Sequence, residues 1–174
     1  MKNLQLALLF LFSIVIVSCG AVEEPISTVR IDGAWTLDQA TGTGQNITYY
    51  NGTPYPAEFS MRTVAPTEYT LTFTPQGKLY STGSFTEEIT GTFQGQSTTR
   101  VVDKSNIVGS GYWKLQGKQL NMGTDSPEEI SMRVLLHTET DLTLEYHRSF
   151  TTTKNGNRVE EEQTITYFLI RRNS

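Results

Sequence analysis

Tyr69-Thr70-Leu71-Thr72-Phe73-Thr74 is the stretch that decides the fold class of this 174-residue chain. Its odd positions are large and its even positions are threonine, which is typical of a β-strand with one wet face. The same alternation recurs over 130–136, 142–147 and 164–170. No stretch after residue 19 keeps a helical period for three turns. The sequence therefore predicts one all-β domain with little helix.

Turn residues separate these runs. Pro75-Gln76-Gly77-Lys78 and Gln116-Gly117-Lys118 each lie between two predicted strands, and 138–141 closes another hairpin. Asn155-Gly156 is a strong hairpin signal because both central residues of a type I′ turn need positive φ. Its flanks are polar on both faces, which predicts a solvated ribbon that projects from the body.

Residues 39–65 are harder to interpret, because glycines and prolines interrupt them and tyrosines lie between. A structureless loop of this length is often functional. We considered a lid across an open barrel end, and also an excursion packed on the outside or a poorly paired strand pair.

The first residues have the three parts of a secretory signal: Lys2 supplies charge, Leu4–Val17 is apolar and Ser18 is small. A membrane span needs roughly 20 apolar residues, and this run is shorter and contains Gln5 and Ser13. We therefore favour a signal peptide over a transmembrane helix.

Cys19, the only cysteine, follows this segment directly. Ile16-Val17-Ser18-Cys19 resembles the lipobox of bacterial lipoproteins, which implies cleavage before Cys19 and fatty acylation of that residue, with palmitate among the acyl groups. Two or more acyl chains hold a protein stably on a membrane. The residue after the cysteine is Gly20, which resembles the pattern of lipoproteins that are sorted to the outer membrane. The protein would then lie on the periplasmic or the cell-surface side of that membrane. The expected division is a signal peptide over 1–18, a lipidated tether over 19–30 and a β-barrel domain over 31–174. A plain secretory signal with a free thiol is the alternative.

The formal net charge of −4 argues against a nucleic-acid partner. We expect no enzyme, cofactor or metal site. His137 and His147 fall on adjacent hairpin strands without a nearby cysteine, a poor zinc pattern, and we expect both on the wet face. Glu87-Glu88 is one of several acidic runs that we interpret as solvated strand edges.

Four patterns resemble the lipocalin-like lipoproteins of Gram-negative bacteria: Gly33–Leu37 with its Gly-x-Trp, Leu71–Leu79, Gly111–Leu120, and Thr140-Asp141-Leu142. The resemblance implies an antiparallel up-and-down meander of about eight or nine strands, closed as a calycin-type barrel. It also implies that Trp35 plugs the barrel floor and that Arg171 or Arg172 stacks across it. Closure is expected on physical grounds too, because a barrel removes the two exposed edges of a sheet.

An eight-strand barrel holds either packed side chains or one small ligand. The sequence therefore leaves two functions open. One is a lipid-anchored envelope protein that binds a small hydrophobic or amphipathic molecule, with tyrosine hydroxyls orienting the ligand's head group. The other is a filled barrel with a structural role or an envelope protein partner. The residues expected in the barrel core or lining a ligand are Trp35, Tyr69, Leu71, Phe73, Trp113, Met132, Val134, Leu144, Tyr146 and Tyr167.

Overall fold

The computed structural model describes residues 30–64, 67–104, 106–124 and 129–172. The predicted signal peptide, Cys19 and most of the predicted tether lie outside these ranges. Within them the regular elements are all β-strands, and we find no helix long and apolar enough to span a membrane. The strands are β1 (Gly33–Tyr50), β2 (Thr53–Val64), β3 (Thr70–Phe73), β4 (Lys78–Thr82), β5 (Phe85–Phe93), β6 (Gln96–Lys104), β7 (Gly111–Gln116), β8 (Gln119–Gly123), β9 (Glu129–His137), β10 (Asp141–Lys154) and β11 (Asn157–Arg171).

The strands form an antiparallel meander, in which each length of strand pairs with the one that precedes it along the chain. Three meander strands are broken in two, as β2 and β3, β4 and β5, and β6 and β7. β1 pairs with β3 along its first residues and with β2 along its second half. The meander closes where β11 pairs with β1, from Trp35 opposite Arg171 to Tyr49 opposite Arg158. The ring contains eight strands, β1, β3, β4, β7, β8, β9, β10 and β11, which confirms the predicted all-β barrel.

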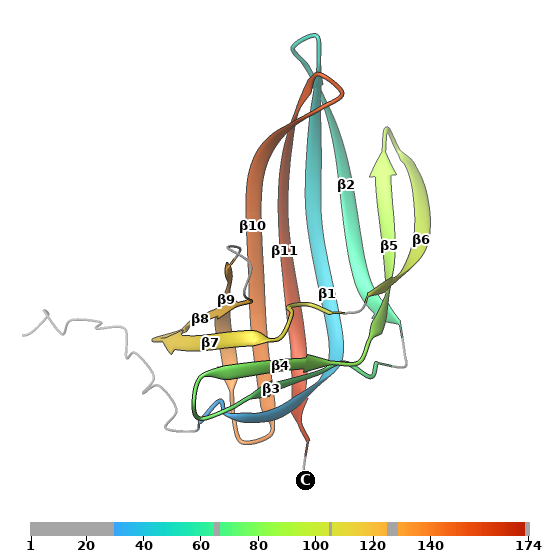
Figure 1. Cartoon of the computed structure of the whole chain (residues 1–174). Helices are drawn as coiled ribbons and strands as arrows, with labels where there is room; N and C mark the ends of the chain where they lie inside the picture. The colour runs from blue at the N-terminus through green and yellow to red at the C-terminus, as the bar shows by residue number, and fades with distance from the viewer. Residues whose placement is uncertain (1–29, 65–66, 105, 125–128, 173–174) are drawn as a thin grey trace, which may run out of the picture.

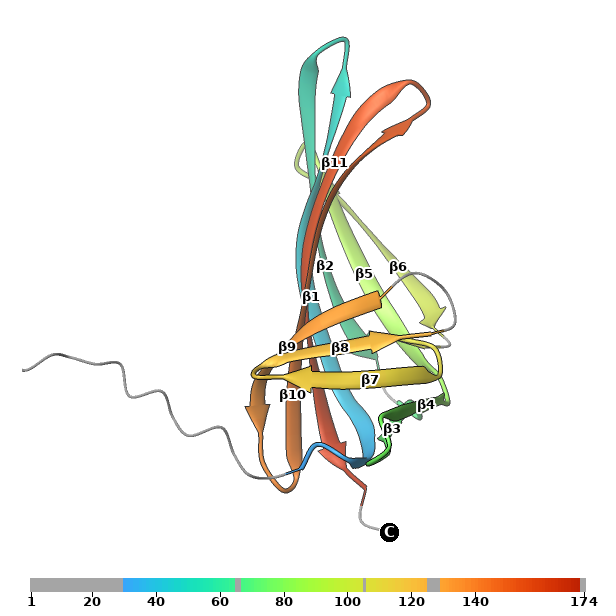
Figure 2. The same ribbon diagram turned by 60° about the vertical axis from the view of Figure 1, so that its left-hand side comes forward.

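The breaks divide the molecule into two parts, which are visible in Figure 1. At the lower end, β3, β4, β7 and β8 cross the long strands and close the barrel. At the upper end, the long strands β10, β11, β1 and β2 continue with β5 and β6 as an open, curved sheet, which we call the wing. Figure 2 shows the wing rising away from the crossing strands. The shortest pairing within the ring joins β4 to β7, which share the pairs Lys78–Tyr112 and Leu79–Gly111.

The barrel floor is built around Trp35, which is fully buried. Its indole N–H donates a 2.7 Å hydrogen bond to the Ile31 carbonyl. The Arg171 guanidinium stacks 4.3 Å from the centre of the indole ring and donates to the carbonyls of Arg30, Asp32 and Glu139. Of the two arginines considered from the sequence, Arg171 is therefore the one that stacks. Arg172 is exposed, and its backbone N–H bonds to Ala34.

Of the three alternatives for residues 39–65, a strand pair forms rather than a lid or an outside excursion, because the described part of the segment belongs to the long hairpin of β1 and β2. The pair is not poorly paired, since its register is continuous from Thr41–Arg62 to Tyr50–Thr53. Gly42 and Gly44 lie inside β1 because neighbouring side chains fold over them. A Cβ on Gly42 would lie 2.9 Å from Met61 Cγ. Pro54 and Pro56 lie where β2 pairs with β1 but has no partner on β5, whose pairing stops at Ala57. A proline is tolerated there because its missing N–H costs no ladder hydrogen bond.

The Asn155-Gly156 turn has the positive φ angles that the sequence predicts, 52° and 79°. The ends of β10 and β11 project with this turn beyond the barrel (Figure 1). Asn51-Gly52 forms an equivalent turn between β1 and β2, with φ angles of 50° and 81°. This second turn has the same Asn-Gly dipeptide, but it was not predicted as a hairpin.

Candidate functional site at the barrel mouth

The side chains expected inside the barrel lie in the hydrophobic core or pack against it. Trp35, Tyr69, Leu71, Phe73, Met132, Leu144 and Tyr167 are buried, and Trp113, Val134 and Tyr146 are partly buried against them. Met132, Tyr146 and Tyr167 of this set also line an open pocket. The Tyr69 hydroxyl is used internally, because it accepts from the Val108 N–H and from Ser81. The closed end of the barrel is therefore filled by its own side chains.

Open space begins where the filled barrel meets the wing. A pocket of about 350 Å³ lies there, which we call the mouth pocket. Its apolar wall comes from the wing, from β9 and from the β6–β7 connection. The residues of this wall are Phe59, Met61, Phe85, Ile89, Ile107, Ile130, Met132 and Ile165. Its polar side chains are Glu87, Lys104, Asn106, Tyr146, Arg148, Gln163 and Tyr167.

Strand register explains why these side chains meet. Across the wing, Tyr146, Ile165, Gly42, Met61, Ile89 and Arg100 are successive Cα partners from β10 to β6. Side chains that are opposite each other in neighbouring strands share a face, and this row faces the pocket. A glycine in the middle of the row lets Met61 and Ile165 close over β1.

Glu87 is the least expected residue of the site. It is 6% exposed, although its place in an acidic run predicts a solvated strand edge. Lys104 Nζ lies 3.5 Å from its carboxylate oxygen Oε2. Burial raises the pKa of Glu87, and the Lys104 charge opposes this shift without cancelling it. A signal was present in the sequence, since Glu87 lies between Phe85 and Ile89 in a period of two and shares their face.

Tyr167 lies across the pocket from Glu87. Both residues lie in one row of Cα partners across the sheet. Tyr167 is the partner of Ala40, Glu87 is the partner of Thr63, and the Ala40 N–H donates to the Thr63 hydroxyl. Because both intervening side chains are small, the row leaves room above β1. Burial raises the pKa of Tyr167, and the charge of Glu87 raises it further. The pocket thus has a carboxylate and a neutral phenol on facing walls, surrounded by apolar side chains.

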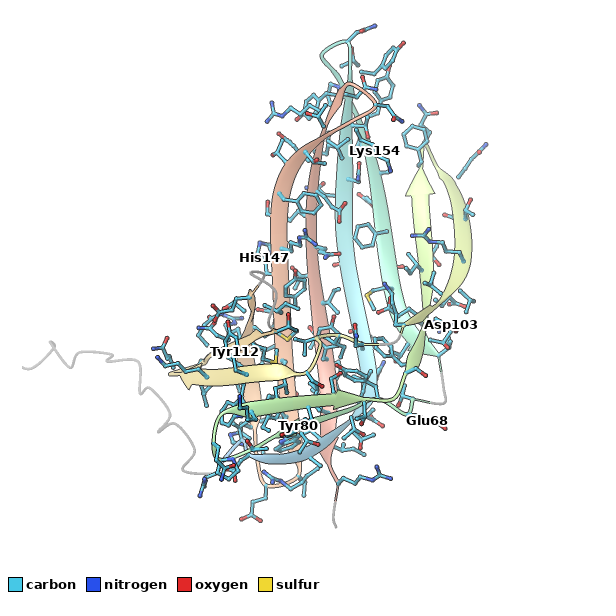
Figure 3. The ribbon with its side chains drawn as sticks, viewed as in Figure 1. Glu68, Tyr80, Asp103, Tyr112, His147 and Lys154 are labelled. Carbon is cyan, nitrogen blue, oxygen red and sulfur yellow. The ribbon has the colours of Figure 1, made fainter. Side chains whose placement is uncertain are left out.

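The two histidines do not come together. His147 is exposed midway along β10 (Figure 3), where it contacts Thr164 on β11. His137 is not on the wet face as expected; it is partly buried against Trp35, with ring centres 5.9 Å apart. Burial and the nearby Arg171 charge lower the pKa of His137. Among the described residues no group of three or more His, Cys, Asp or Glu side chains could hold a metal ion.

A second open surface lies at the distal end of the wing. Tyr50, Tyr55 and Phe93 are exposed there by 57%, 37% and 45%. With Thr48 and Ala57 they line an apolar pocket of about 420 Å³. These aromatic side chains come from β1, β2 and β5, and we call them the tip cluster.

No protein-family model matches the chain, and no curated protein matches it. A structural comparison aligned it with the crystal structure of Ail, the attachment invasion locus protein of Yersinia pestis. That alignment covers 80% of this chain and 99% of the other, with 7% sequence identity and a TM-score of 0.26. A TM-score this low supports no conclusion about this chain, so the site is interpreted from its own residues.

Proposed function

We propose that this protein is a lipid-anchored envelope barrel that binds a small amphipathic molecule in the mouth pocket. The observation that supports this proposal best is the pocket itself, about 350 Å³ of space with an apolar wall and a few polar side chains. Ligand pockets commonly have this size and this mixture of lining residues. The proposed role is binding rather than catalysis.

The filled barrel floor determines where such a ligand would lie. Trp35, Leu37 and Leu120 have no exposed surface, so a ligand would have to displace packed side chains to enter the closed end. Displacing core packing costs several kcal/mol, typically about 2–5 for one large side chain. The mouth pocket requires no such rearrangement. We therefore place the binding site between the wing and β9.

A second candidate function is an interaction module whose partner is another envelope protein. The tip cluster favours it, because exposed aromatic side chains gathered over an apolar surface are typical of protein interfaces. This surface lies at the far end of the wing from the mouth pocket, so the two functions are compatible.

Probe binding tests the ligand proposal. Every strand and the whole described core lie between residues 31 and 171, so the chain can be produced from residue 20 onward. It is titrated with N-phenyl-1-naphthylamine, a neutral apolar dye that fluoresces when it leaves water. We expect saturable binding to one site. Ile89→Trp should abolish binding by filling the pocket, whereas Leu135→Trp on the exposed face of β9 should retain it.

Near-ultraviolet circular dichroism establishes that both variants are folded. Absence of saturable binding to the unmodified chain would overturn the proposed function. Equal binding of the dye by Ile89→Trp and Leu135→Trp would show that the site lies outside the mouth pocket.

The anchor and its membrane are tested separately on the full chain in a Gram-negative host. We expect the processed protein to partition into the detergent phase, to incorporate radiolabelled palmitate and to sediment with outer membranes. Cys19→Ala should lose the label, and the chain should either stay uncleaved or leave the detergent phase. A processed Cys19→Ala protein that stays in the detergent phase would refute acylation.

A further inference from the structure

The mouth pocket continues into a groove along the concave face of the wing. The groove is lined by Asn46, Phe59, Ile89, Gly91, Thr98, Arg100, Glu161 and Gln163. It shares Phe59, Ile89 and Gln163 with the mouth pocket, so the two spaces are adjacent. Its lining residues run across the wing from β11 to β6.

The charged side chains that line these two spaces are Glu87, Lys104, Arg148, Arg100 and Glu161. Lys104 and Glu87 offset each other as an ion pair. Arg148 on β10 also lines the mouth pocket, and its guanidinium stacks 4.4 Å from the centre of the Phe150 ring. Within the described ranges no carboxylate forms an ion pair with Arg148 or with Arg100. Both arginines are exposed; Arg148 lines the mouth pocket and Arg100 lines the groove.

An apolar surface begins one row below Arg148. Arg148 is the Cα partner of Gln163, and the next inward position on each strand is Tyr146 and Ile165. Two residues along a strand span about 6–7 Å. Met61 and Ile89 lie in the same lower row across the wing. A cationic group above an apolar wall at this spacing fits a head group joined directly to a hydrocarbon chain.

Building on the proposed function, we propose that the ligand is an amphipath with an anionic head group, a carboxylate or a phosphate. The anion pairs with the Arg148 guanidinium, and the hydrocarbon chain lies against Met61, Ile89 and Ile165 in the mouth pocket. Arginine suits this role because its planar fork of N–H donors matches both anions. Arg100 supplies a second positive charge from β6, on the opposite side of the wing from Arg148.

A cationic amphipath is the competing class, since Glu87 and two tyrosines also line the pocket. Two features disfavour it. Glu87 already faces Lys104, and burial makes its charged form costly, as its raised pKa shows. A ligand cation would have to displace Lys104 from the carboxylate.

Competition among ligands with the same chain tests the head group. The chain from residue 20 onward is loaded with N-phenyl-1-naphthylamine. The dye is then displaced with dodecanoate, dodecyl phosphate, dodecanol or dodecyltrimethylammonium, each below its micelle concentration. We expect both anions to bind about tenfold more tightly than dodecanol, the effect of one charge-assisted hydrogen bond. The ratio between the two anions shows which head group the site prefers. Added salt should reduce the preference.

Arg148→Gln should bring the dodecanoate-to-dodecanol affinity ratio close to one. Lys114→Gln is the matched control, because it removes the same charge from an exposed residue of β7 that does not line the pocket. It should keep the ratio of the unmodified chain.

The outcomes separate the two proposals. Dye binding with equal affinity for all head groups overturns the anionic head group and leaves the binding function intact. Tighter binding of dodecyltrimethylammonium overturns it in favour of recognition by Glu87. An anion preference that survives Arg148→Gln overturns the assignment of Arg148. Failure of the dye to bind at all is the only outcome that overturns the proposed function as well.

Discussion

Replacing Arg171 with glutamine should lower the free energy of unfolding, because it loosens the barrel floor. The effect should be large for a side chain that is partly exposed. The Arg171 guanidinium stacks on Trp35 and donates to three backbone carbonyls. These carbonyls belong to Arg30, Asp32 and Glu139, so one side chain joins the start of the domain, the β9–β10 turn and the end of β11. Glutamine lacks the planar fork of donors and cannot reproduce this arrangement.

The expected loss follows from the individual contacts. A cation–π contact that is partly exposed contributes about 0.5–1 kcal/mol. The 3.0 Å bond to Asp32 is partly buried and contributes about 1.5 kcal/mol as a charged hydrogen bond. The bonds to Glu139 and Arg30 are exposed, and each contributes about 0.5 kcal/mol. Together they predict a decrease of about 3 kcal/mol in the free energy of unfolding.

Urea denaturation, followed by tryptophan fluorescence, measures this loss. Arg172→Gln provides a control one residue away, because Arg172 is exposed and uses only its backbone N–H. It should change the free energy of unfolding by less than about 0.5 kcal/mol. Equal effects of the two substitutions would refute the view that Arg171 fastens the floor.

Three further predictions concern buried groups. Trp35→Ala should lower the free energy of unfolding by about 3–5 kcal/mol in urea denaturation, and a loss below about 1 kcal/mol would mean that the floor repacks without it. Glu87→Gln should stabilise the protein at neutral pH, because the raised pKa of Glu87 means that its charged form opposes folding. That penalty is absent below the ordinary glutamate pKa of about 4.3, so the gain should vanish in urea titrations near pH 4, whereas exposed Glu58→Gln should show no such trend. The lowered pKa of His137 means that protons bind the unfolded state more readily. Stability should therefore fall as the pH drops through about 6.5, and thermal melts of His137→Leu should lose this dependence while those of His147→Leu retain it.

Local alternation was enough to identify the strands and their buried faces. Leu71 and Phe73 are 1% exposed, as their places in the opening stretch predict. A period of two reports directly which face of a strand is apolar, and burying that face drives the fold. The Asn155-Gly156 turn was predictable for the same local reason, since few other residues adopt positive φ at both central positions.

Pairing between strands that are distant in the sequence leaves no such local pattern, so it was not predicted. Gly42, Gly44, Pro54 and Pro56 interrupt residues 39–65 and indicate a loop when taken locally. In the structure, β11 pairs along β1 from Trp35 to Tyr49, and this pairing overrides the weak local preference. A cavity at one end of the barrel was one of the two interiors considered from the sequence, but the place and the wall of the mouth pocket were not predictable, because they depend on where three meander strands break.

The breaks in the three meander strands explain why a filled barrel has an open mouth. The broken strands contact one another at these positions. The β2–β3 break meets the β4–β5 break where the Glu68 N–H donates to the Ser84 carbonyl, 3.0 Å away. Gly83 is required there, because its φ is 85° and a Cβ would lie 2.0 Å from the Glu68 carbonyl oxygen. The buried Tyr69 hydroxyl fixes the β6–β7 break through Val108. Beyond these contacts the strands turn away from the barrel axis and become the wing (Figure 2). The wall of the mouth pocket is therefore fastened to the buried core, and function can vary on the wing without loss of the scaffold that holds it.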